Sequence, residues 1–423
     1  MRERNTLWHP AFGTVIVYLA IQFACVTLLS YSSSLFVNII AEDLNAAVGT
    51  TQLRTVPGSI VAVLMLPFAN KIYNKIGFKF SICLGVCSYC LAFVGMSFAP
   101  NVYVYIACGT LIGVGNALAL FVPGPYMINA WFHKGTAIAI MIPTAGAALL
   151  ATFTTPWIQG LIEAWGWRPA LRFIALLGMA VGVVCTVLFA IPTPESRGMR
   201  PWGWTEDKNA AVQTKSNVVR GVSIKNARRS PVLYMLVIIC MINGFPGVMS
   251  RFISPLATGS GFSTEQATLA VSIFAMGTTI TTILVSFIVS AMGLKRYTLT
   301  FIVFNIICYL LLVFNGGNYV LFSIGLVGIS LNSLNQMHQL AGKEIFGVMD
   351  LAEIIAIMNV GFNLVNMVSG SIMGYVYDFT GSYKGILLAI AVMLAISFVL
   401  VILIYKKKDS LPWEELTVEV AKK

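Results

Sequence analysis

Amide side chains recur at helical spacing in one apolar stretch of the chain. The four amides are Asn332, Asn335, Gln336 and Gln339, at positions i, i+3, i+4 and i+7 of one helical face, and the cation Lys343 follows on the same face at i+11. Each amide can donate and accept hydrogen bonds, so this face suits a polar solute. The alternative is that the amides hydrogen-bond neighbouring helices and hold them together. Four amides on one face are more than helix packing usually requires, so we expect a polar cavity.

Two further apolar stretches carry amides that we expect to border the same cavity. Asn359, Asn363 and Asn366 follow one another at i, i+4 and i+7. Asn243 directly precedes Gly-Phe-Pro-Gly at residues 244–247, where proline removes a helical hydrogen bond and permits a kink. This interruption is a candidate hinge for a gate.

Arg54 and Arg251 are the cations closest to the apolar interior. Arginine presents a planar fork that can hold a carboxylate with two hydrogen bonds. We therefore expect one or both to attract and bind an anion. Both could instead belong to a gate at an entrance. Arg54 would then pair with Glu42 or Asp43, and Arg251 would pair with Glu265.

Titratable side chains are scarce in the apolar stretches, and no acid falls in the middle of one. A cationic solute would find no buried counter-charge, so the pattern favours an anionic or neutral solute. His338 and Glu353 are candidates for taking up a proton, since histidine titrates near neutral pH. His338 could also be a simple interfacial side chain. Gln22 and Tyr31, in the first apolar stretch, complete the candidate binding residues.

The composition places these residues in a membrane protein. Hydrophobic residues make up 58% of the 423 residues and charged residues 10%, whereas soluble domains have about 45–50% and about 25%. Runs long enough to cross a bilayer as a helix recur twelve times. They cover roughly residues 12–39, 48–71, 78–99, 102–124, 135–160, 169–191, 231–256, 264–291, 297–315, 318–342, 351–376 and 384–405.

Basic residues set the orientation of these runs. If both termini are cytoplasmic, 22 of the 27 lysines and arginines fall on the cytoplasmic side, as the positive-inside rule requires. The polar, basic stretch from Ile191 to Ser230 then lies on that side and divides the chain. The net charge of +11 therefore indicates a multi-pass protein of the cell (inner) membrane and no nucleic-acid partner.

The runs predict an all-α membrane protein of twelve transmembrane helices in two six-helix bundles. We expect an N-terminal bundle at residues 1–191 and a cytoplasmic linker at 192–230. A C-terminal bundle should follow at 231–405, with a cytoplasmic tail at 406–423. Two bundles of equal orientation indicate a parallel repeat, with a substrate site between its halves.

The loops that follow the second and eighth runs resemble the basic, glycine-containing loop of the major facilitator superfamily. One reads Lys75-Ile76-Gly77-Phe78-Lys79 and the other reads Gly293-Leu294-Lys295-Arg296. The usual aspartate of that loop is replaced by Asn74 and Ser290. The resemblance implies the major facilitator fold.

Four further segments resemble the branch of monocarboxylate transporters and oxalate/formate antiporters. They are Tyr31-Ser32-Ser33-Ser34-Leu35-Phe36, the stretch 129–137, Gly166-Trp167-Arg168, and Asp378-Phe379-Thr380-Gly381-Ser382-Tyr383. The resemblance implies secondary active transport of a small organic anion, a mono- or dicarboxylate, by alternating access. Proton symport and anion exchange both remain open.

Other functions are weaker readings of the sequence. Export of a neutral or aromatic metabolite or drug is suggested by the aromatic residues Tyr31, Phe121, Tyr126 and Phe245. An enzyme would need paired acids, a Ser/His dyad or a metal set within the runs, and none is present. A channel suits two matching bundles less well than a carrier. We expect a functional monomer in the lipid bilayer, with a small-molecule substrate, possible use of protons, and neither metal nor cofactor.

Overall fold

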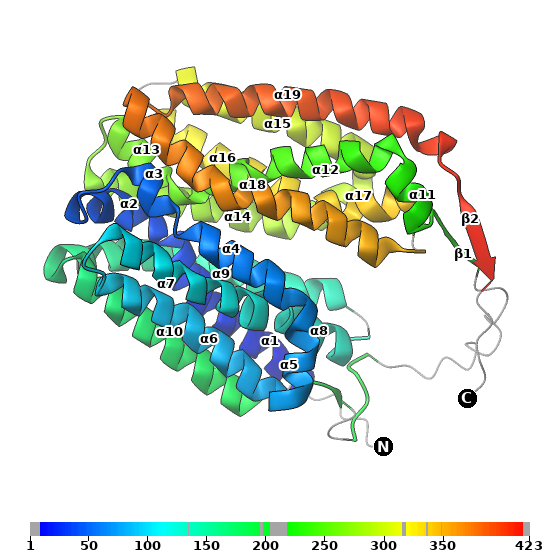
Figure 1. The fold of residues 1–423 in the computed structure, drawn as a ribbon, viewed down its shortest axis with the longest axis horizontal. Coiled ribbons are helices and arrows are strands. Elements are labelled where there is room, and N and C mark those ends of the chain that lie inside the picture. The colour runs from blue at the N-terminus through cyan, green and yellow to red at the C-terminus, as the bar shows by residue number, and fades with distance from the viewer. Residues whose placement is uncertain are drawn as a thin grey trace.

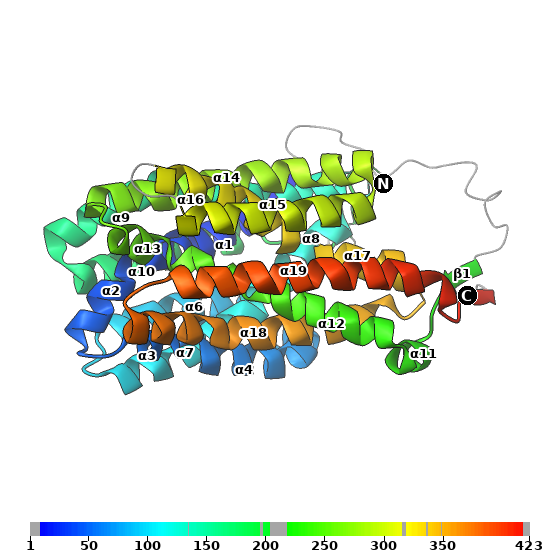
Figure 2. The same ribbon diagram turned by 90° about the horizontal axis from the view of Figure 1, so that it is seen from above.

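The structure is a computed structural model. It describes residues 9–133, 135–194, 198–203, 218–314, 319–335, 337–347 and 349–417. Two bundles of long helices lie side by side, the N-terminal half below and the C-terminal half above in Figure 1. Figure 2 shows the same helices running along the long axis of the molecule.

The N-terminal half is built from helices whose length follows the apolar runs. They are α1 (Pro10–Gln22), η1 (Phe23–Tyr31), α2 (Ser33–Asp43), α3 (Val48–Gln52), α4 (Thr55–Met65), η2 (Leu66–Phe68), α5 (Ala69–Ile76), α6 (Phe78–Ser97), α7 (Val102–Gly115), η3 (Asn116–Leu120), α8 (Pro123–Trp131), α9 (Thr136–Trp165) and α10 (Trp167–Phe189). The fourth span continues through α8 to Trp131, beyond the predicted end at residue 124.

The C-terminal half repeats this plan. Its elements are β1 (Val218–Gly221), α11 (Ile224–Arg229), α12 (Pro231–Gly244), η5 (Pro246–Arg251), α13 (Ile253–Gly259), α14 (Thr264–Met292), α15 (Leu294–Phe314), α16 (Tyr319–Asn335), α17 (Met337–Phe346), α18 (Leu351–Thr380), α19 (Lys384–Lys407), η6 (Lys408–Ser410) and β2 (Glu414–Thr417). All twelve predicted runs fall on these helices and those of the first half.

The surface of the bundles is apolar. Ten helices of the described chain are long and apolar enough to cross a membrane, and the helix from Tyr319 to Leu331 is a shorter apolar one. Large side chains such as Phe80, Phe153 and Leu188 are more than 60% exposed along these helices. Such a surface is stable against lipid, because the helices satisfy their own backbone hydrogen bonds.

The two ends of the molecule differ. We call the end that carries α11 and the antiparallel β1–β2 ribbon the terminal end, and the opposite end, with α3 and α13, the distal end (Figure 1). Elements of the two halves meet where α3 and α4 pack on α18, α2 packs on α13, and α9 packs on α14. In Figure 1 the ribbons of the two halves lie closest at the distal end.

Glycines bring neighbouring helices into backbone contact at matching places in the two halves. A Cβ atom on Gly109 would overlap the carbonyl oxygen of Arg54, and one on Gly113 would overlap that of Gly58. In the second half a Cβ on Gly277 would lie 2.6 Å from the Gly325 carbonyl oxygen. Small residues at these positions allow the backbones of neighbouring helices to approach closely.

Regular α-helix is interrupted in the middle of several spans. Residues 23–31 and 116–120 form π-helix, and the chain turns at Leu53 and Arg54 between α3 and α4. The predicted interruption in the seventh span is confirmed, since α12 ends at Gly244 and a 3-10 helix begins at Pro246. Such irregular turns free backbone groups and are tolerated only where protein or water surrounds them.

The linker packs on both halves at the terminal end. The Trp202 N–H donates to the Trp131 carbonyl at 2.7 Å, and the His133 N–H donates to the Trp202 carbonyl at 2.9 Å. Beyond residue 217, the Val222 N–H donates to the Phe346 carbonyl at 2.8 Å. Each end of the linker is therefore fixed to the half that it adjoins.

Candidate functional site

A cavity lies between the two halves, and we call it the central cavity. Residues of spans 1 to 4 form most of its wall, and Arg251 joins them from span 7. They are Leu29, Ser30, Ser33, Arg54, Thr55, Gly58, Ser59, Tyr89, Phe93, Ile112, Asn116 and Arg251. The cavity measures about 70 Å³. One water needs about 10–15 Å³ on this scale, so several waters or one small solute can enter.

Arg54 reaches the cavity from the turn between α3 and α4. Its carbonyl packs directly on Gly109 of α7, which fixes the turn in place. The side chain is 5% exposed, and its Nε has no hydrogen-bond partner within the described chain. The guanidinium carbon lies 5.8 Å from the centre of the Phe93 ring and 6.0 Å from that of Tyr105. Two aromatic faces thus hold the cation without neutralising it.

Arg251 enters from the opposite half, as the last residue of η5. The break at Pro246 ends α12 and directs this short helix toward the centre of the molecule. A Cβ on Gly370 of α18 would lie 3.7 Å from Arg251 Nη1, an ordinary van der Waals distance, so the guanidinium lies against this part of α18. Nη1 is buried and lacks a hydrogen-bond partner in the described part of the chain.

The charge of this site is uncompensated. Within the described ranges neither Arg54 nor Arg251 pairs with a carboxylate, and no described residue of the cavity wall is acidic. Two buried like charges repel each other more strongly than they would in water. Buried charges are normally paired, so the cavity favours an anion.

Hydroxyl and amide groups complete the wall. Ser30, Ser33 and Ser59 face the cavity together with Asn116, the first residue of the π-helix η3. The Ser33 hydroxyl donates to the Ser30 carbonyl at 2.7 Å, which leaves its oxygen free to accept. These groups can orient a small polar solute beside the two cations.

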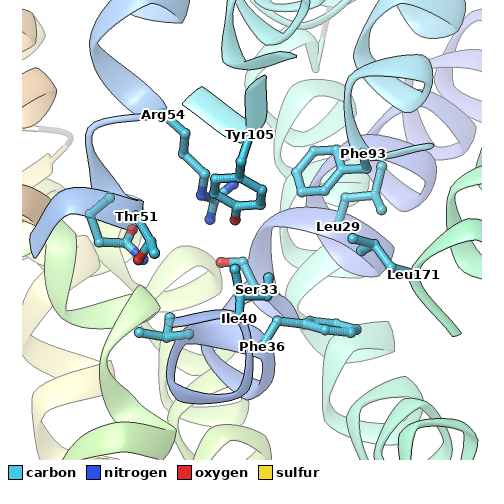
Figure 3. A pocket seen from close by; sticks show the side chains of 11 residues that line it. Leu29, Ser33, Phe36, Ile40, Thr51, Arg54, Phe93, Tyr105 and Leu171 are labelled. Atoms are coloured by element: carbon cyan, nitrogen blue, oxygen red, sulfur yellow. The ribbon is translucent and has the colours of Figure 1, made fainter. Parts of the chain in front are cut away.

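A second, smaller cavity of about 10 Å³ adjoins Arg54, and we call it the side cavity. Leu29, Ser33, Arg54 and Phe93 line both cavities. Figure 3 shows the Arg54 side chain beside the Tyr105 ring, with Ser33 and Thr51 around the same space. Arg54 thus lies between the two spaces.

Hydrogen bonds join the two halves at the distal end and beside the central cavity. The Asp378 carboxylate accepts from the N–H groups of Val48 and Gly49 at 3.1 and 2.9 Å. The hydroxyls of Thr50 and Tyr375 are 3.0 Å apart. In the same region the Thr55 hydroxyl donates to the Met367 carbonyl at 2.9 Å.

Three of the predicted binding residues lie elsewhere. The Tyr31 hydroxyl is 3.2 Å from that of Thr278, so it bridges the halves beside the cavity. Gln22 donates to the Tyr18 hydroxyl at 3.1 Å. Asn243 is 3% exposed and lines a separate cavity inside the C-terminal half, where its Oδ1 has no partner in the described chain.

Asn359 and Asn363 of the eleventh run lie in the part of α18 that is nearer the terminal end. Asn363 donates to the Asn359 carbonyl at 2.8 Å, and neither residue lines the two cavities. Glu353 is exposed in the first turn of α18. Asn332 and Asn335 belong to α16, and His338 and Gln339 to α17, but their side chains lie outside what the structure describes. Gln336 lies outside the described residues.

None of the alternative gate pairs is formed among the described residues, whether Arg54 with Glu42 or Asp43 or Arg251 with Glu265. Asp43 instead binds Arg168 at 2.6 Å, and Arg168 also donates to the carbonyls of Ser97 and Ala99. This pair fastens the distal ends of three spans within the N-terminal half. Asp43 is therefore engaged away from the central cavity.

Several wall residues were absent from the sequence prediction. Tyr89 and Asn116 do not belong to a stripe of amides or charges in the third and fourth runs, so helical spacing does not mark them. Ser33 lies in the segment from Tyr31 to Phe36, which the sequence distinguishes only by its resemblance, and Ser30 directly precedes that segment. A search for isolated polar residues in spans 3 and 4 would have found Tyr89 and Asn116.

Solved structures share this fold. A bacterial homologue of the human lysosomal transporter Spinster, in an inward-facing and unoccupied conformation, aligns with a TM-score of 0.69 at 13% identity and covers 97% of this chain and 100% of its own. A mutant of the nucleoside transporter NupG aligns with a TM-score of 0.68 at 13% identity, over 94% and 100%. At such identity the likeness shows the fold alone, and it confirms the predicted arrangement of twelve helices in two bundles.

Related sequences include several monocarboxylate transporters. Human monocarboxylate transporter 12 is 23% identical over 367 residues, which cover 80% of this chain and 70% of that protein. Mouse monocarboxylate transporter 4 is 28% identical over 182 residues, or 41% of this chain and 38% of that protein. In four further relatives from human, frog and mouse, the matched segment spans only 24% to 29% of the protein.

A model of the Major Facilitator Superfamily matches residues 13–344 and 247–422, so it covers nearly the whole described chain. The basic, glycine-containing loops predicted from the sequence lie at equivalent places in the two halves. Gly77 and Gly293 adopt φ values of 89° and 76° between α5 and α6 and between α14 and α15. The chain belongs to the Major Facilitator Superfamily and is a multi-pass membrane transporter related to the monocarboxylate transporters.

Proposed function

We propose that the protein is a secondary transporter that carries a small organic anion, a mono- or dicarboxylate, by alternating access. The observation that carries this proposal is the central cavity, where Arg54 and Arg251 come from opposite halves and no described wall residue is acidic. A carboxylate there would accept charge-assisted hydrogen bonds from both planar guanidiniums. The relatives named as monocarboxylate transporters support the choice of anion.

An anion between Arg54 and Arg251 would couple binding to the arrangement of the halves. It would neutralise two like charges that otherwise repel each other across the interface. Occupancy therefore favours the state in which both arginines face one cavity, and release of the anion makes that state less favourable. The two halves rock about such a site in alternating access.

Anion exchange fits the described wall better than proton symport. An empty cavity would leave Arg54 and Arg251 without a counter-charge, so return of the empty carrier is unfavourable. Of the two predicted proton acceptors, Glu353 is exposed in the first turn of α18, at the terminal end. Arg251 contacts the same helix much later, at Gly370. His338 remains a candidate on sequence grounds. Exchange predicts that an anion on the far side of the membrane accelerates uptake.

We infer that the terminal end is cytoplasmic and that the protein acts as a monomer in the cell membrane. Lys75 and Lys79 lie at this end. The three basic residues of α11, Lys225, Arg228 and Arg229, lie there too. Basic residues gather on the cytoplasmic side of membrane proteins. A single chain supplies every residue of the central cavity, which supports the monomer.

Uptake of labelled pyruvate into proteoliposomes tests the proposal. Loss of a charge-assisted hydrogen bond costs about 1.5–3 kcal/mol, so Arg251→Gln should raise the apparent KM by about 10- to 100-fold. Arg172→Gln is the matched control, because Arg172 lies within α10, 4.3 Å from the Phe98 ring, and lines neither cavity.

If Arg251→Gln transports pyruvate as the parent does at equal protein level, Arg251 does not bind the anion and the proposed site is disproved. Strong inhibition by neutral aromatic compounds, with none by carboxylates, would instead favour export of a neutral or aromatic metabolite. The aromatic residues that suggested such a substrate line neither described cavity.

A further inference from the structure

The short helix α3 begins at the interface between the halves and ends beside the central cavity. Its five residues run from Val48 to Gln52, and Arg54 follows two residues later. Only Leu53 separates α3 from Arg54, so we expect a displacement of α3 to change the position of the Arg54 side chain. The position of this helix links the distal contact between the halves to the cation in the cavity.

The start of α3 lacks a cap of its own. The first N–H groups of a helix have no intrahelical partner and are normally capped by Ser, Thr, Asp or Asn. The residue at this position is Ala47, which makes no side-chain cap. Asp378 of the opposite half supplies the missing acceptors, since its two carboxylate oxygens bind the N–H groups of Val48 and Gly49.

The surrounding contacts allow this capping only when the halves are close together. A Cβ on Gly374 would lie 2.5 Å from the Gly49 Cα, so the two backbones touch. The Thr50 hydroxyl, on the residue after Gly49, is hydrogen-bonded to the Tyr375 hydroxyl, one turn before Asp378 on α18. When the distal end opens, α18 withdraws and both N–H groups of α3 lose their acceptor.

We propose that Asp378 is a positioning residue of the transport cycle, which caps α3 from the opposite half and so holds Arg54 in the central cavity while the distal end is closed. This role deepens the proposed function and rests on it where it concerns the anion. It explains how closure of one end and assembly of the anion site occur together. Opening of the distal end uncaps α3 and frees Arg54 to leave the site.

A cysteine at position 51 measures the closure without any substrate. Thr51 is 1% exposed beneath the contact, so Thr51→Cys should react slowly with a polar thiol reagent in the purified full-length protein. Replacing a helix cap shifts an equilibrium by about 2- to 30-fold. In the Thr51→Cys background, Asp378→Asn should raise the labelling rate by that factor. The protein that retains Thr51 serves as the reference, because its labelling rate gives the reactivity of the native cysteines.

The matched control is Asp350→Asn. Asp350 also caps a short helix, since its Oδ2 accepts from the Ile224 N–H at 2.7 Å, but this contact lies at the terminal end. Its replacement should leave labelling at position 51 unchanged. Gly374→Ala is a second, steric disruption of the distal contact and should raise labelling as Asp378→Asn does.

Thermal protection by pyruvate then tests the link to Arg54. Asp378→Asn should need a higher pyruvate concentration than the parent for the same protection, and Asp350→Asn should not. Unchanged labelling in both Asp378→Asn and Gly374→Ala would overturn the capping role. Faster labelling with normal pyruvate protection would overturn the link to Arg54. If pyruvate and other carboxylates fail to protect even the parent, the proposed function fails, whereas the labelling result still decides the capping role.

Discussion

At the scale of single residues, the two arginines of the central cavity are the unusual feature. Each has a nitrogen without a partner in the described chain, although buried polar groups are almost always hydrogen-bonded. Phe93 and Tyr105 stabilise the Arg54 guanidinium only in part, because an aromatic face attracts a cation without cancelling its charge. The remaining interaction is available to an anionic substrate.

His9 offers a pH-dependent test of how the first span begins. Its Nδ1 accepts from the Ala11 N–H at 3.2 Å and so caps α1, and its ring packs against Trp131 and Trp202. Burial lowers the pKa of His9 below its usual 6.5. Protonation therefore favours the unfolded state, so the contribution of His9 to stability is present above pH 6.5 and is lost as pH falls.

Thermal unfolding at several pH values measures this contribution. A cap contributes about 1 kcal/mol, so the melting temperature of the parent should fall by about 1 °C between neutral and acidic pH. His9→Asn keeps a capping side chain that does not titrate, and its melting temperature should change less. An equal decline in both proteins would show that His9 is not responsible.

The sequence identified residues of the right chemistry but could not place them together. Arg54 and Arg251 stood out because charges are costly inside a membrane. Nothing local relates two positions so far apart in the chain, and their meeting depends on how the two halves pack. Asn243 shows the converse, since the sequence predicts that it borders the same cavity as the other amides, but it lines a separate cavity inside the C-terminal half.

At the scale of elements, Gly109 of α7 fixes the turn that carries Arg54. Gly109→Ala should lower stability by about 1–3 kcal/mol, because the added methyl group overlaps the Arg54 carbonyl. Gly160→Ala in α9 is the control, since a Cβ there meets no atom within 4 Å. Alanine favours helix over glycine, so this control should be neutral or stabilising by up to about 1 kcal/mol.

Unfolding temperatures in detergent, together with pyruvate protection, compare the two alanine variants. The Gly109 variant should melt earlier and should bind pyruvate less well, because its Arg54 is displaced. If it melts and binds as the parent does, then α7 does not set the position of the turn at Arg54.

Element boundaries followed from the sequence only where a local signal exists. Pro246 predicted the break in the seventh span, because proline cannot donate the helical hydrogen bond. The π-helices at 23–31 and 116–120 contain no proline, and no local signal in the sequence marks them. The turn at Arg54 is likewise set by Gly109 and by Asp378, which lie far away in sequence.

At the scale of the whole molecule, the halves are joined near the distal end. The hydrogen bonds from α3 and α4 to α18, and that between Tyr31 and Thr278, bridge the halves on this side or beside the cavity. If the terminal end is cytoplasmic, this arrangement corresponds to a carrier that is closed to the outside. An anion held by one arginine from each half would couple the movements of the two halves.

Thermal protection of the purified protein by pyruvate and by its neutral methyl ester tests the central claim most directly. Both ligands have nearly the same shape, and only pyruvate carries the charge that Arg54 and Arg251 would bind. The account predicts that pyruvate raises the melting temperature of the parent, that the ester does not, and that Arg54→Gln and Arg251→Gln each abolish the effect of pyruvate. Equal protection by the ester, or undiminished protection by pyruvate in both variants, would contradict it.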